Sequence, residues 1–240
     1  MHHFFFFAAP DNIQENTVTL TDEDFRHCIQ VLRKNIGDEI DITDGRGKII
    51  TAVIETIDKN SCDCRIVQAA FQEKKDIPEI LLTFGMLKSS ALENLVRDTV
   101  ALGVTELVPL LMKHSVKPKF NAERLHRIAI ESVKQSGNCY CPIIRKPQKF
   151  SDWIVSLDRE SVKLIADQAA SRRISDIYWS TEIKKPVIVL IGPEGGFHPG
   201  EMNMAVENGF IPVNISPYRL RSELAAVVAV SALLNRGIDE

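Results

Sequence analysis

The sequence predicts a small β-barrel followed by an α/β domain whose mostly parallel sheet is covered by helices on both faces. Up to about residue 70 the expected strands are short and alternate apolar with polar residues, which is typical of a sheet with one solvated face. Beyond residue 79, continuous apolar strands alternate with helices, which is typical of buried parallel strands. A polar stretch containing Pro78 separates the two patterns. We therefore expect a barrel over 1–72, a linker over 73–78 and the α/β domain over 79–240.

The barrel region contains one clear hairpin and one helix. Residues 39–57 read as two strands joined at Asp44–Gly47, where glycines supply the positive φ of a tight turn. Thr21 is expected to cap a helix over 21–33, because acidic residues follow it and basic residues close the segment. The run Phe4–Phe7 lacks a basic leader and is expected to form a first strand with alternating burial, rather than a signal peptide.

The second domain shows capped helices between apolar strands. Ser90 and Glu93 form a predicted capping box for a helix that stops at Gly103, and Asn121 opens a helix that stops at Gly137. The last two helices are expected to start near Pro199 and Ser222. The expected strands are 80–87, 104–111, 162–166, 187–192 and 210–216. Ligands of such sheets bind beyond the carboxyl ends of the strands.

Composition narrows the class of protein. The chain has 240 residues, a net charge of −3 and 25% charged residues, and it has no apolar run of about 18 residues that could cross a membrane. We expect a cytoplasmic protein with no membrane partner. Five cysteines do not suit a disulfide framework. Cys62 with Cys64, and Cys139 with Cys141, have a spacing that four-thiolate zinc sites also use, but we favour apolar packing on a strand face and expect no metal.

Charge is unevenly distributed along this acidic chain. Residues 113–149 carry nine lysines and arginines against Glu123 and Glu131, a net charge of +7. A basic segment of this size can contact the phosphate backbone of a nucleic acid, or it can simply be a solvated helix face. Both interpretations stay open on charge alone.

The stretch IGPEGGF at 191–197 directly follows an apolar strand and is the strongest local motif. It lacks the Lys-Ser/Thr of a P-loop and the spacing of a dinucleotide fingerprint. Its glycines and Pro193 suit a flat ligand held by backbone hydrogen bonds, such as an adenine edge. A structural turn that needs positive φ is the alternative.

IGPEGGF, followed by LRSELAAVVAVSALL, resembles the ribosomal RNA small subunit methyltransferase E family, of the SPOUT class of S-adenosylmethionine-dependent RNA methyltransferases. The likeness covers nearly the whole chain. It includes His27-Cys-Ile-Gln-Val31-Leu32-Arg33, Leu102-Gly103-Val104 before Pro109, and Gln135-Ser136 before Pro142. The resemblance implies a PUA-like barrel, then a domain threaded as a trefoil knot, and a homodimer that methylates N3 of a uridine in 16S ribosomal RNA.

The resemblance also implies a donor site at three loops of the knot. The residues expected to bind S-adenosylmethionine are Ala166, Asp167, Ile191, Gly192, Glu194, Gly195, Gly196, Ile215, Leu220, Arg221 and Ser222. Arg221 is expected to stabilise the negative charge that spreads over the uridine oxygens when N3 loses its proton. Glu223 is a candidate base or a helix-dipole partner, and Ser222 is expected to be an N-cap.

The expected RNA contacts come from both domains. They are Arg26, His27, Arg33, Lys34, Lys113, His114, Lys117, Arg145 and Lys146. The chain departs from the family pattern at Arg97, Ala101, Asn138, Ser216 (with Pro217-Tyr218-Arg219) and Leu224, which affects the expected RNA contacts and donor rim. Two other activities stay open: methylation of another site or of a ribose 2′-oxygen, and RNA binding without catalysis.

Overall fold

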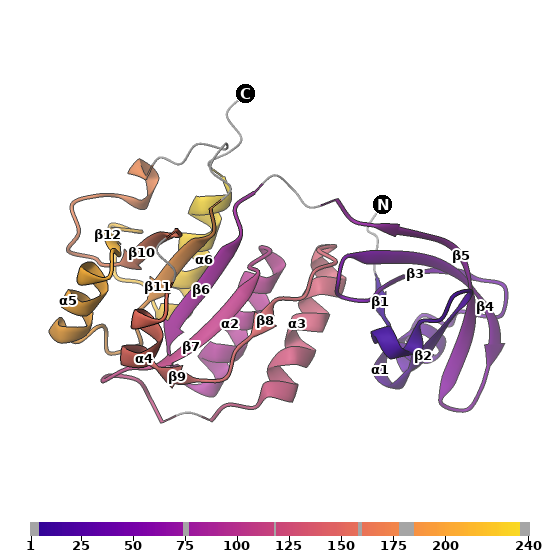
Figure 1. Ribbon diagram of the computed structural model, residues 1–240. Helices are drawn as coiled ribbons and strands as arrows, with labels where there is room; N and C mark the ends of the chain where they lie inside the picture. Colours follow the sequence, from indigo (N-terminus) through magenta and orange to yellow (C-terminus); the bar gives the residue numbers. More distant parts are fainter. Residues whose placement is uncertain (1–4, 74–76, 118, 158–159, 178–184, 236–240) are drawn as a thin grey trace. The chain divides into compact units, whose positions relative to one another are not determined.

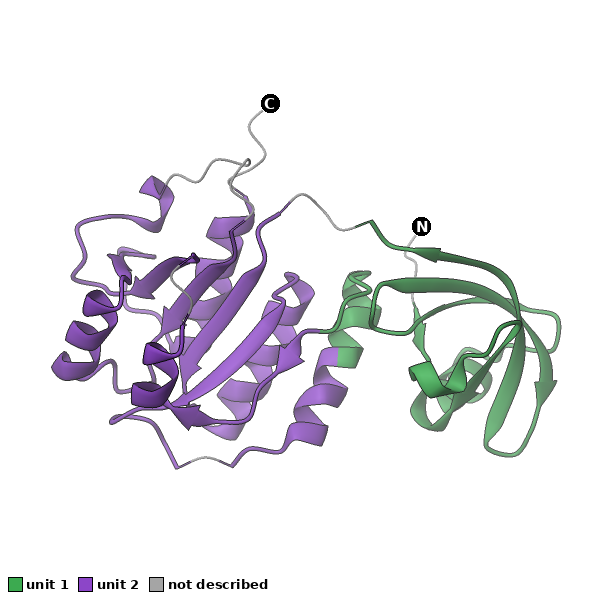
Figure 2. Cartoon of the chain, viewed as in Figure 1, with its two compact units in different colours: residues 1–74, 130–141 green, residues 75–129, 142–240 purple. Residues whose placement is uncertain are grey.

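The structure is a computed structural model that describes residues 5–73, 77–117, 119–157, 160–177 and 185–235. The chain forms two compact units (Figure 2). Unit 1 contains residues 1–74 and 130–141, and unit 2 contains residues 75–129 and 142–240. Phe4 and half of the predicted linker (74–76) lie outside the described residues. The assignment of 130–141 to unit 1 was not anticipated from the sequence.

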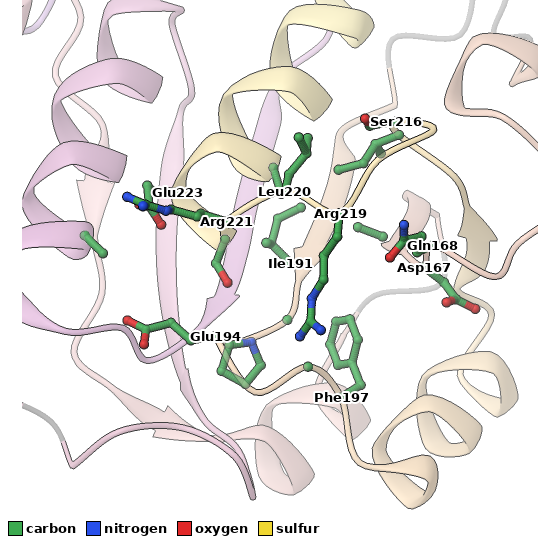
Figure 3. Close-up of a pocket in the computed structure, with 18 of the residues that line it drawn as sticks. Asp167, Gln168, Ile191, Glu194, Phe197, Ser216, Arg219, Leu220, Arg221 and Glu223 are labelled. Carbon is green, nitrogen blue, oxygen red and sulfur yellow. The ribbon is translucent and has the colours of Figure 1, made fainter.

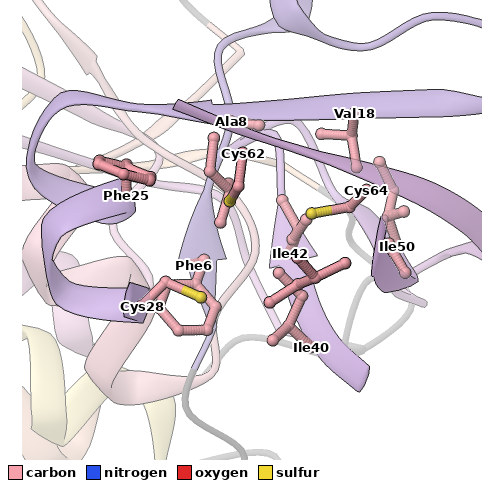
Figure 4. Packing of buried hydrophobic residues seen from close by; sticks show 13 residues of the cluster. Phe6, Ala8, Val18, Phe25, Cys28, Ile40, Ile42, Ile50, Cys62 and Cys64 are labelled. Carbon is pink, nitrogen blue, oxygen red and sulfur yellow. The ribbon is translucent and has the colours of Figure 1, made fainter. Parts of the chain in front are cut away.

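Unit 1 is built on a five-stranded sheet in the order β1-β3-β4-β5-β2 (Figure 1). All its pairs are antiparallel except β1 with β3. Alternate residues of the strands point inward and form an apolar core that includes Ile42, Ile50 and Ile54, all fully buried (Figure 4). Phe5 and Phe6 are both buried, so the predicted alternation is not seen there. The strands are β1 Phe6–Phe7, β2 Thr17–Thr21, β3 Glu39–Thr43, β4 Lys48–Ile57 and β5 Ser61–Phe71.

The predicted hairpin is confirmed as β3 and β4, and its glycines have two roles. Gly45 and Gly47 have φ of +71° and +96°, as the turn requires. They also leave room for the segment 139–141: an added Cβ would lie 2.9 Å from Cys141 Sγ at Gly45, and would overlap Cε1, Cζ and the hydroxyl of Tyr140 at Gly47. Backbone N–H groups of Gly47 and Cys141 donate to Cys139 O and Gly45 O, both at 2.8 Å.

The predicted helix in unit 1 begins where expected but is irregular. After the short 3₁₀ turn η1 (Pro10–Asn12) and β2, helix α1 covers Asp22–Arg26 and continues as a π-helical turn, η2 (His27–Val31). Thr21 is the N-cap residue, but its hydroxyl donates to Asp22 Oδ2 rather than accepting from the helix backbone, so the predicted capping bond is wrong.

Unit 2 contains a parallel sheet in the order β12-β10-β11-β6-β7-β8, with β9 also paired to β7. Helices α2 and α6 pack together on one face, and α4 and α5 contribute to the apolar cluster on the other (Figure 1). Its strands are β6 Ile80–Gly85, β7 Glu106–Leu111, β8 Ile143–Ile144, β9 Gln148–Lys149, β10 Val162–Ala166, β11 Val187–Ile191 and β12 Ile211–Val213. Its helices are α2 Ser89–Ala101, α3 Ala122–Ser136 (which ends in unit 1), α4 Phe150–Val155, the 3₁₀ turn η3 Ile174–Asp176, α5 Pro199–Glu207 and α6 Ser222–Leu234.

Most predicted helix ends are confirmed. Gly103 and Gly137 have φ of +89° and +73° after α2 and α3, and Asn121 Oδ1 accepts from Arg124 N at 3.0 Å. The predicted capping box of Ser90 and Glu93 is wrong, because α2 begins at Ser89 with Lys88 as an N-cap that makes no side-chain capping bond. The Glu93 carboxylate instead accepts two hydrogen bonds from the Arg124 guanidinium.

Candidate functional site

A cavity of about 820 Å³ lies in unit 2, beyond the carboxyl ends of β10 and β11 and beside the first turn of α6 (Figure 3). This is where an open parallel sheet is expected to bind its ligand, and the volume is within the usual range for small-molecule sites. Four chain segments line the cavity: 88–91, 166–168, 191–197 and 215–225, with Met202 from α5.

The glycine turn, residues 192–196, is shaped by close packing. A Cβ on Gly85 would come within 2.5–2.8 Å of Pro193, so the glycine at the end of β6 lets the turn sit directly on the sheet. A Cβ on Gly192 would lie 3.1 Å from the Phe197 ring. Gly196 has φ +75° and its N–H donates to Pro193 O at 2.8 Å, which closes the turn. The positive φ therefore belongs to Gly196, while Gly85 and Gly192 are needed for space.

Side chains from two other loops hold the glycine turn. His114 Nδ1 lies 3.1 Å from Gly196 O, and it must be the donor because a carbonyl oxygen only accepts. A Cβ on Gly195 would lie 2.9 Å from His114 Cβ. Lys88 Nζ lies 3.2 Å from Glu194 Oε2, in a largely solvated ion pair. Lys88 follows β6 and His114 follows β7, so these two side chains connect the glycine turn to the loops after two other strands of the same sheet.

The segment after β12 runs alongside the loop after β10 and is hydrogen-bonded to it. Asn214 Nδ2 donates to Gln168 O and Asn214 N donates to Arg172 O, both at 2.8 Å. Ile174 N donates to Asn214 O at 2.9 Å. Asn214 thus joins the loop after β10 to the segment after β12, two of the four segments that line the cavity, which fixes their spacing.

The first turn of α6 brings Arg221, Ser222 and Glu223 to the cavity. Arg221 is the N-cap residue and its side chain is exposed, while Ser222 is the first helical residue and is buried. The prediction of Ser222 as the N-cap is therefore wrong by one position. No described residue forms a hydrogen bond or ion pair with the Arg221 guanidinium, so it is available to a substrate.

Ten of the eleven residues predicted to bind the donor line this cavity, as do both catalytic candidates. The exception is Gly195, which faces His114 instead. The predicted donor-binding and catalytic residues leave out eleven residues that also line the cavity, and five of these adjoin a predicted one in the chain. They are Lys88, Ser90, Ala91, Gln168, Pro193, Phe197, Met202, Ser216, Tyr218, Arg219 and Ala225. No binding motif marked the segment 88–91, in which Ser90 was predicted only as part of a capping box; its position after a parallel strand was the one indication of a ligand site.

The residues predicted to contact RNA are divided between the units. Arg26, His27, Arg33 and Lys34 belong to α1 and η2 of unit 1 or follow them, and Arg33 has φ +54°. The other five belong to unit 2. Arg145 forms an ion pair with Glu106, with 2.7 Å between Nε and Oε1. Lys134 of the basic segment is buried in unit 1.

The five cysteines do not all lie at one site. Cys28, Cys62 and Cys64 lie together in the apolar core of unit 1 (Figure 4). Cys141 instead packs against Gly45 at the hairpin turn. Burial raises the pKa of Cys141 to about 11, which disfavours the thiolate that a metal needs. Within the described ranges, no three His, Cys, Asp or Glu side chains form a possible metal site. No described helix is both long and apolar enough to span a bilayer.

Comparison with known families and structures gives consistent results. Residues 73–234 match the family described as RNA methyltransferase domain, and residues 20–67 match the RNA methyltransferase PUA domain. Ribosomal RNA small subunit methyltransferase E of Aquifex aeolicus is 30% identical over 201 residues, which are 79% of this chain and 82% of that protein. The Synechocystis protein of the same name is 27% identical over 231 residues, 94% of this chain and 75% of that protein.

Solved structures agree in fold. Ribosomal RNA small subunit methyltransferase E from Neisseria gonorrhoeae, bound to S-adenosyl methionine, has a TM-score of 0.86 at 26% identity and covers 96% of each chain. A probable rRNA-methyltransferase from Porphyromonas gingivalis has a TM-score of 0.84 at 35% identity, covering 94% of this chain and 95% of that one. The predicted fold class, a PUA-like barrel followed by a knotted α/β domain, is confirmed. The chain belongs to the ribosomal RNA small subunit methyltransferase E family.

Proposed function

We propose that this chain transfers a methyl group from S-adenosylmethionine to N3 of a uridine in 16S ribosomal RNA. The observation that carries the proposal is the cavity formed by the glycine turn, the loop after β10 and the start of α6, in a chain similar to a structure solved with S-adenosyl methionine. The relatives' shared name supports 16S ribosomal RNA as the substrate class. A ribosomal RNA substrate also supports our proposal that the protein acts in the cytoplasm.

The residues of the cavity fit this donor. Ile191, Leu220 and Phe197 provide apolar surface for the adenine and the methionine chain, and backbone groups of the glycine turn can bond the adenine edge. The predicted donor-binding residues that line the cavity would hold the molecule, and Gly195 would act by shaping the turn. When bound, the donor supplies an activated methyl group on its sulfonium.

Arg221 and Glu223 are assigned to the uridine. The imide N3–H must lose its proton, and the resulting charge spreads over O2 and O4 of the base. The Arg221 guanidinium, with no partner among the described residues, can donate hydrogen bonds to those oxygens. Glu223 lies in the first turn of α6 on the same side of the cavity and is the candidate acceptor of the proton (Figure 3). Because base pairing hides the N3 edge, the uridine must be unpaired or flipped out.

Contacts to the RNA backbone are assigned to the exposed cations of both units. Arg26, Arg33, Lys113, Lys117 and Lys146 are all exposed. Such contacts orient the substrate and add affinity that falls with salt, without reading sequence. Six of the nine predicted contact residues have intramolecular partners for their side chains in the structure, so we assign them secondary roles: Arg26, His27, Lys34, Lys113, His114 and Arg145.

We also propose that the active form is a homodimer that uses α6. This helix is apolar on all sides: Ala226, Ala229 and Val230 face the core of unit 2, while the stripe of Leu224, Val227 and Val228 is left partly exposed. Leu224 is 48% exposed. A helix that is hydrophobic all round is normally buried on both sides, and a second copy of the chain would cover the open stripe.

The deciding experiment is primer extension on 16S ribosomal RNA from a strain that lacks the gene. Methylation at N3 blocks Watson–Crick pairing, so we expect one strong stop in the parent strain that is absent from the deletion strain. Purified protein with S-adenosylmethionine should restore that stop on ribosomal RNA or subunits from the deletion strain. Nucleoside mass spectrometry would then identify N3-methyluridine. A stop that survives deletion, or a ribose-methylated product, would contradict the proposal.

A further inference from the structure

The Arg219 guanidinium enters the cavity and has no protein partner. Arg219 lines the cavity, and in Figure 3 its side chain extends towards Phe197 and the glycine turn, whereas Arg221 points to the side where Glu223 lies. No described residue forms an ion pair or hydrogen bond with the Arg219 guanidinium. Because no described carboxylate pairs with this guanidinium, its position indicates that the ligand supplies the negative charge.

The carboxylates that line the same cavity either have other partners or lie away from Arg219. Glu194 is paired with Lys88 at 3.2 Å, and Asp167 Oδ1 accepts from Ala169 N at 3.0 Å. Glu223 lies with Arg221 on the other side of the cavity (Figure 3). The two arginines are therefore separated by Leu220 and serve different parts of the cavity.

The loop that presents Arg219 is preformed by two side-chain bonds to its backbone. Ser216 N donates to Asn214 Oδ1 at 3.0 Å, and Tyr218 N donates to Ser216 Oγ at 3.1 Å. The second bond needs the hydroxyl of Ser216, one of the residues that departs from the family pattern. The serine thus fixes the backbone immediately before Arg219, so that less ordering is needed when a ligand binds.

We propose that Arg219 binds the carboxylate of the donor's methionine part. This inference rests on the proposed function, because it assumes S-adenosylmethionine in the cavity. The donor has a single carboxylate, and a planar guanidinium can bond both of its oxygens at once. Arg219 is thereby a donor-specificity residue: it distinguishes S-adenosylmethionine from molecules that share the adenosine and sulfonium but lack the carboxylate.

A test compares two ligands on four proteins by isothermal titration calorimetry. The ligands are S-adenosylmethionine and its decarboxylated analogue, and the proteins are the unaltered chain, Arg219→Ala, Arg219→Lys and Arg172→Ala. Arg172 is a matched control, since it is exposed near the same loops but does not line the cavity. We expect the unaltered chain to bind S-adenosylmethionine about 10- to 100-fold more tightly than the analogue, as for other hydrogen bonds to charged groups.

Arg219→Ala should lose that preference, Arg219→Lys should keep part of it, and Arg172→Ala should keep all of it. In turnover assays Arg219→Ala should raise KM for the donor and leave kcat nearly unchanged, because the contact is the same in the ground and transition states. Equal weakening of both ligands by Arg219→Ala would show a packing role and overturn the inference. So would unchanged donor binding with a raised KM for RNA, which would assign Arg219 to the substrate. If the unaltered chain bound neither ligand, the proposed function itself would fail.

Discussion

Lys134 Nζ lies 3.1 Å from Asp24 Oδ1 in unit 1, with only 2% and 12% of the two side chains exposed. Glu131 Oε1 is 2.6 Å from the same ammonium, and Phe7 N donates to Asp24 Oδ1 at 2.9 Å. Burial raises the pKa of Asp24, and Lys134 and the Phe7 N–H offset only part of this effect. Burial lowers the pKa of Lys134, but Glu131 and Asp24 outweigh it and the pKa is raised.

Replacing Lys134 with methionine should therefore destabilise unit 1 strongly. Loss of one partner leaves a buried carboxylate without a cation, which typically costs about 3–5 kcal/mol. Without Lys134 the pKa of Asp24 rises further, so the folded state holds a proton more tightly than the unfolded chain. The deficit should be largest at neutral pH and smaller at an acidic pH, where more of Asp24 is protonated. Urea unfolding at both pH values measures this.

The double variant Asp24→Asn/Lys134→Met separates the carboxylate from other effects of the substitution. It should recover part of the lost stability at neutral pH and show little of the pH dependence, because no buried charge remains at position 24. If the single and double variants were equally unstable at both pH values, packing around the lysine stem would explain the loss.

Replacing Arg221 with alanine should separate binding from catalysis. Removal of one donor to a developing oxyanion typically lowers turnover about 10²- to 10³-fold. Donor affinity should change little, because the proposed partner of Arg221 is the uridine. Calorimetry with S-adenosylmethionine and single-turnover methylation of ribosomal RNA give the two quantities. Parallel loss of both would mean that Arg221 supports the cavity rather than the reaction.

A methyl group at Gly85 should displace the glycine turn. In Gly85→Ala the new Cβ would come within 2.5–2.8 Å of Pro193, including its backbone nitrogen, so the turn must move. We expect donor binding to weaken at least about tenfold, which corresponds to about 1.4 kcal/mol. Gly200→Ala is the control: its Cβ would lie 3.3 Å from the His198 ring, a side chain that can shift. Unaltered donor affinity in Gly85→Ala would show that the turn does not position the donor.

A charge on the open stripe of α6 should prevent dimerisation. Leu224→Glu would place a carboxylate in the proposed apolar interface, which is unfavourable unless the charge is paired. We expect light scattering to give the mass of a monomer, with loss of methylation. Val206→Glu is matched to it, since Val206 on α5 is equally exposed at 48%. That variant should keep the mass of the unaltered chain. A Leu224→Glu protein that stayed dimeric would exclude this face of α6.

Strand positions and helix ends were largely predictable because they depend on local chemistry. Apolar runs such as 187–191 and the glycines at 103 and 137 act within a few residues, and the structure has them where the sequence predicts. Capping predictions were less successful. Glu93 was expected to bond within its own helix, but a guanidinium 31 residues away in the sequence provides a stronger charge-assisted partner.

The cavity was predictable only where a motif marked it. The glycine turn and Arg221 belong to recognisable stretches, so their neighbourhood could be assigned. Lys88, Ser90 and Ala91 reach the cavity because β6 lies beside β11 in the sheet, a pairing between segments about a hundred residues apart. Arg219 was noted only as a departure from the family pattern. Its position in the cavity depends on side-chain bonds from Asn214 and Ser216, which no periodicity reveals.

The grouping of residues 130–141 with the first 74 has a practical consequence for dissecting the protein. Gln72 bonds the Gly137 carbonyl and the Cys139 N–H through its side chain, and the Tyr140 hydroxyl through its backbone. A fragment that ended after β5 would lose these hydrogen bonds. It would also lose Lys134, the only cation bonded to Asp24 among the described residues. For unit 1 to fold on its own, residues 130–141 would have to be supplied, either as a separate peptide or by fusion. Limited proteolysis between the two units would therefore release no intact barrel.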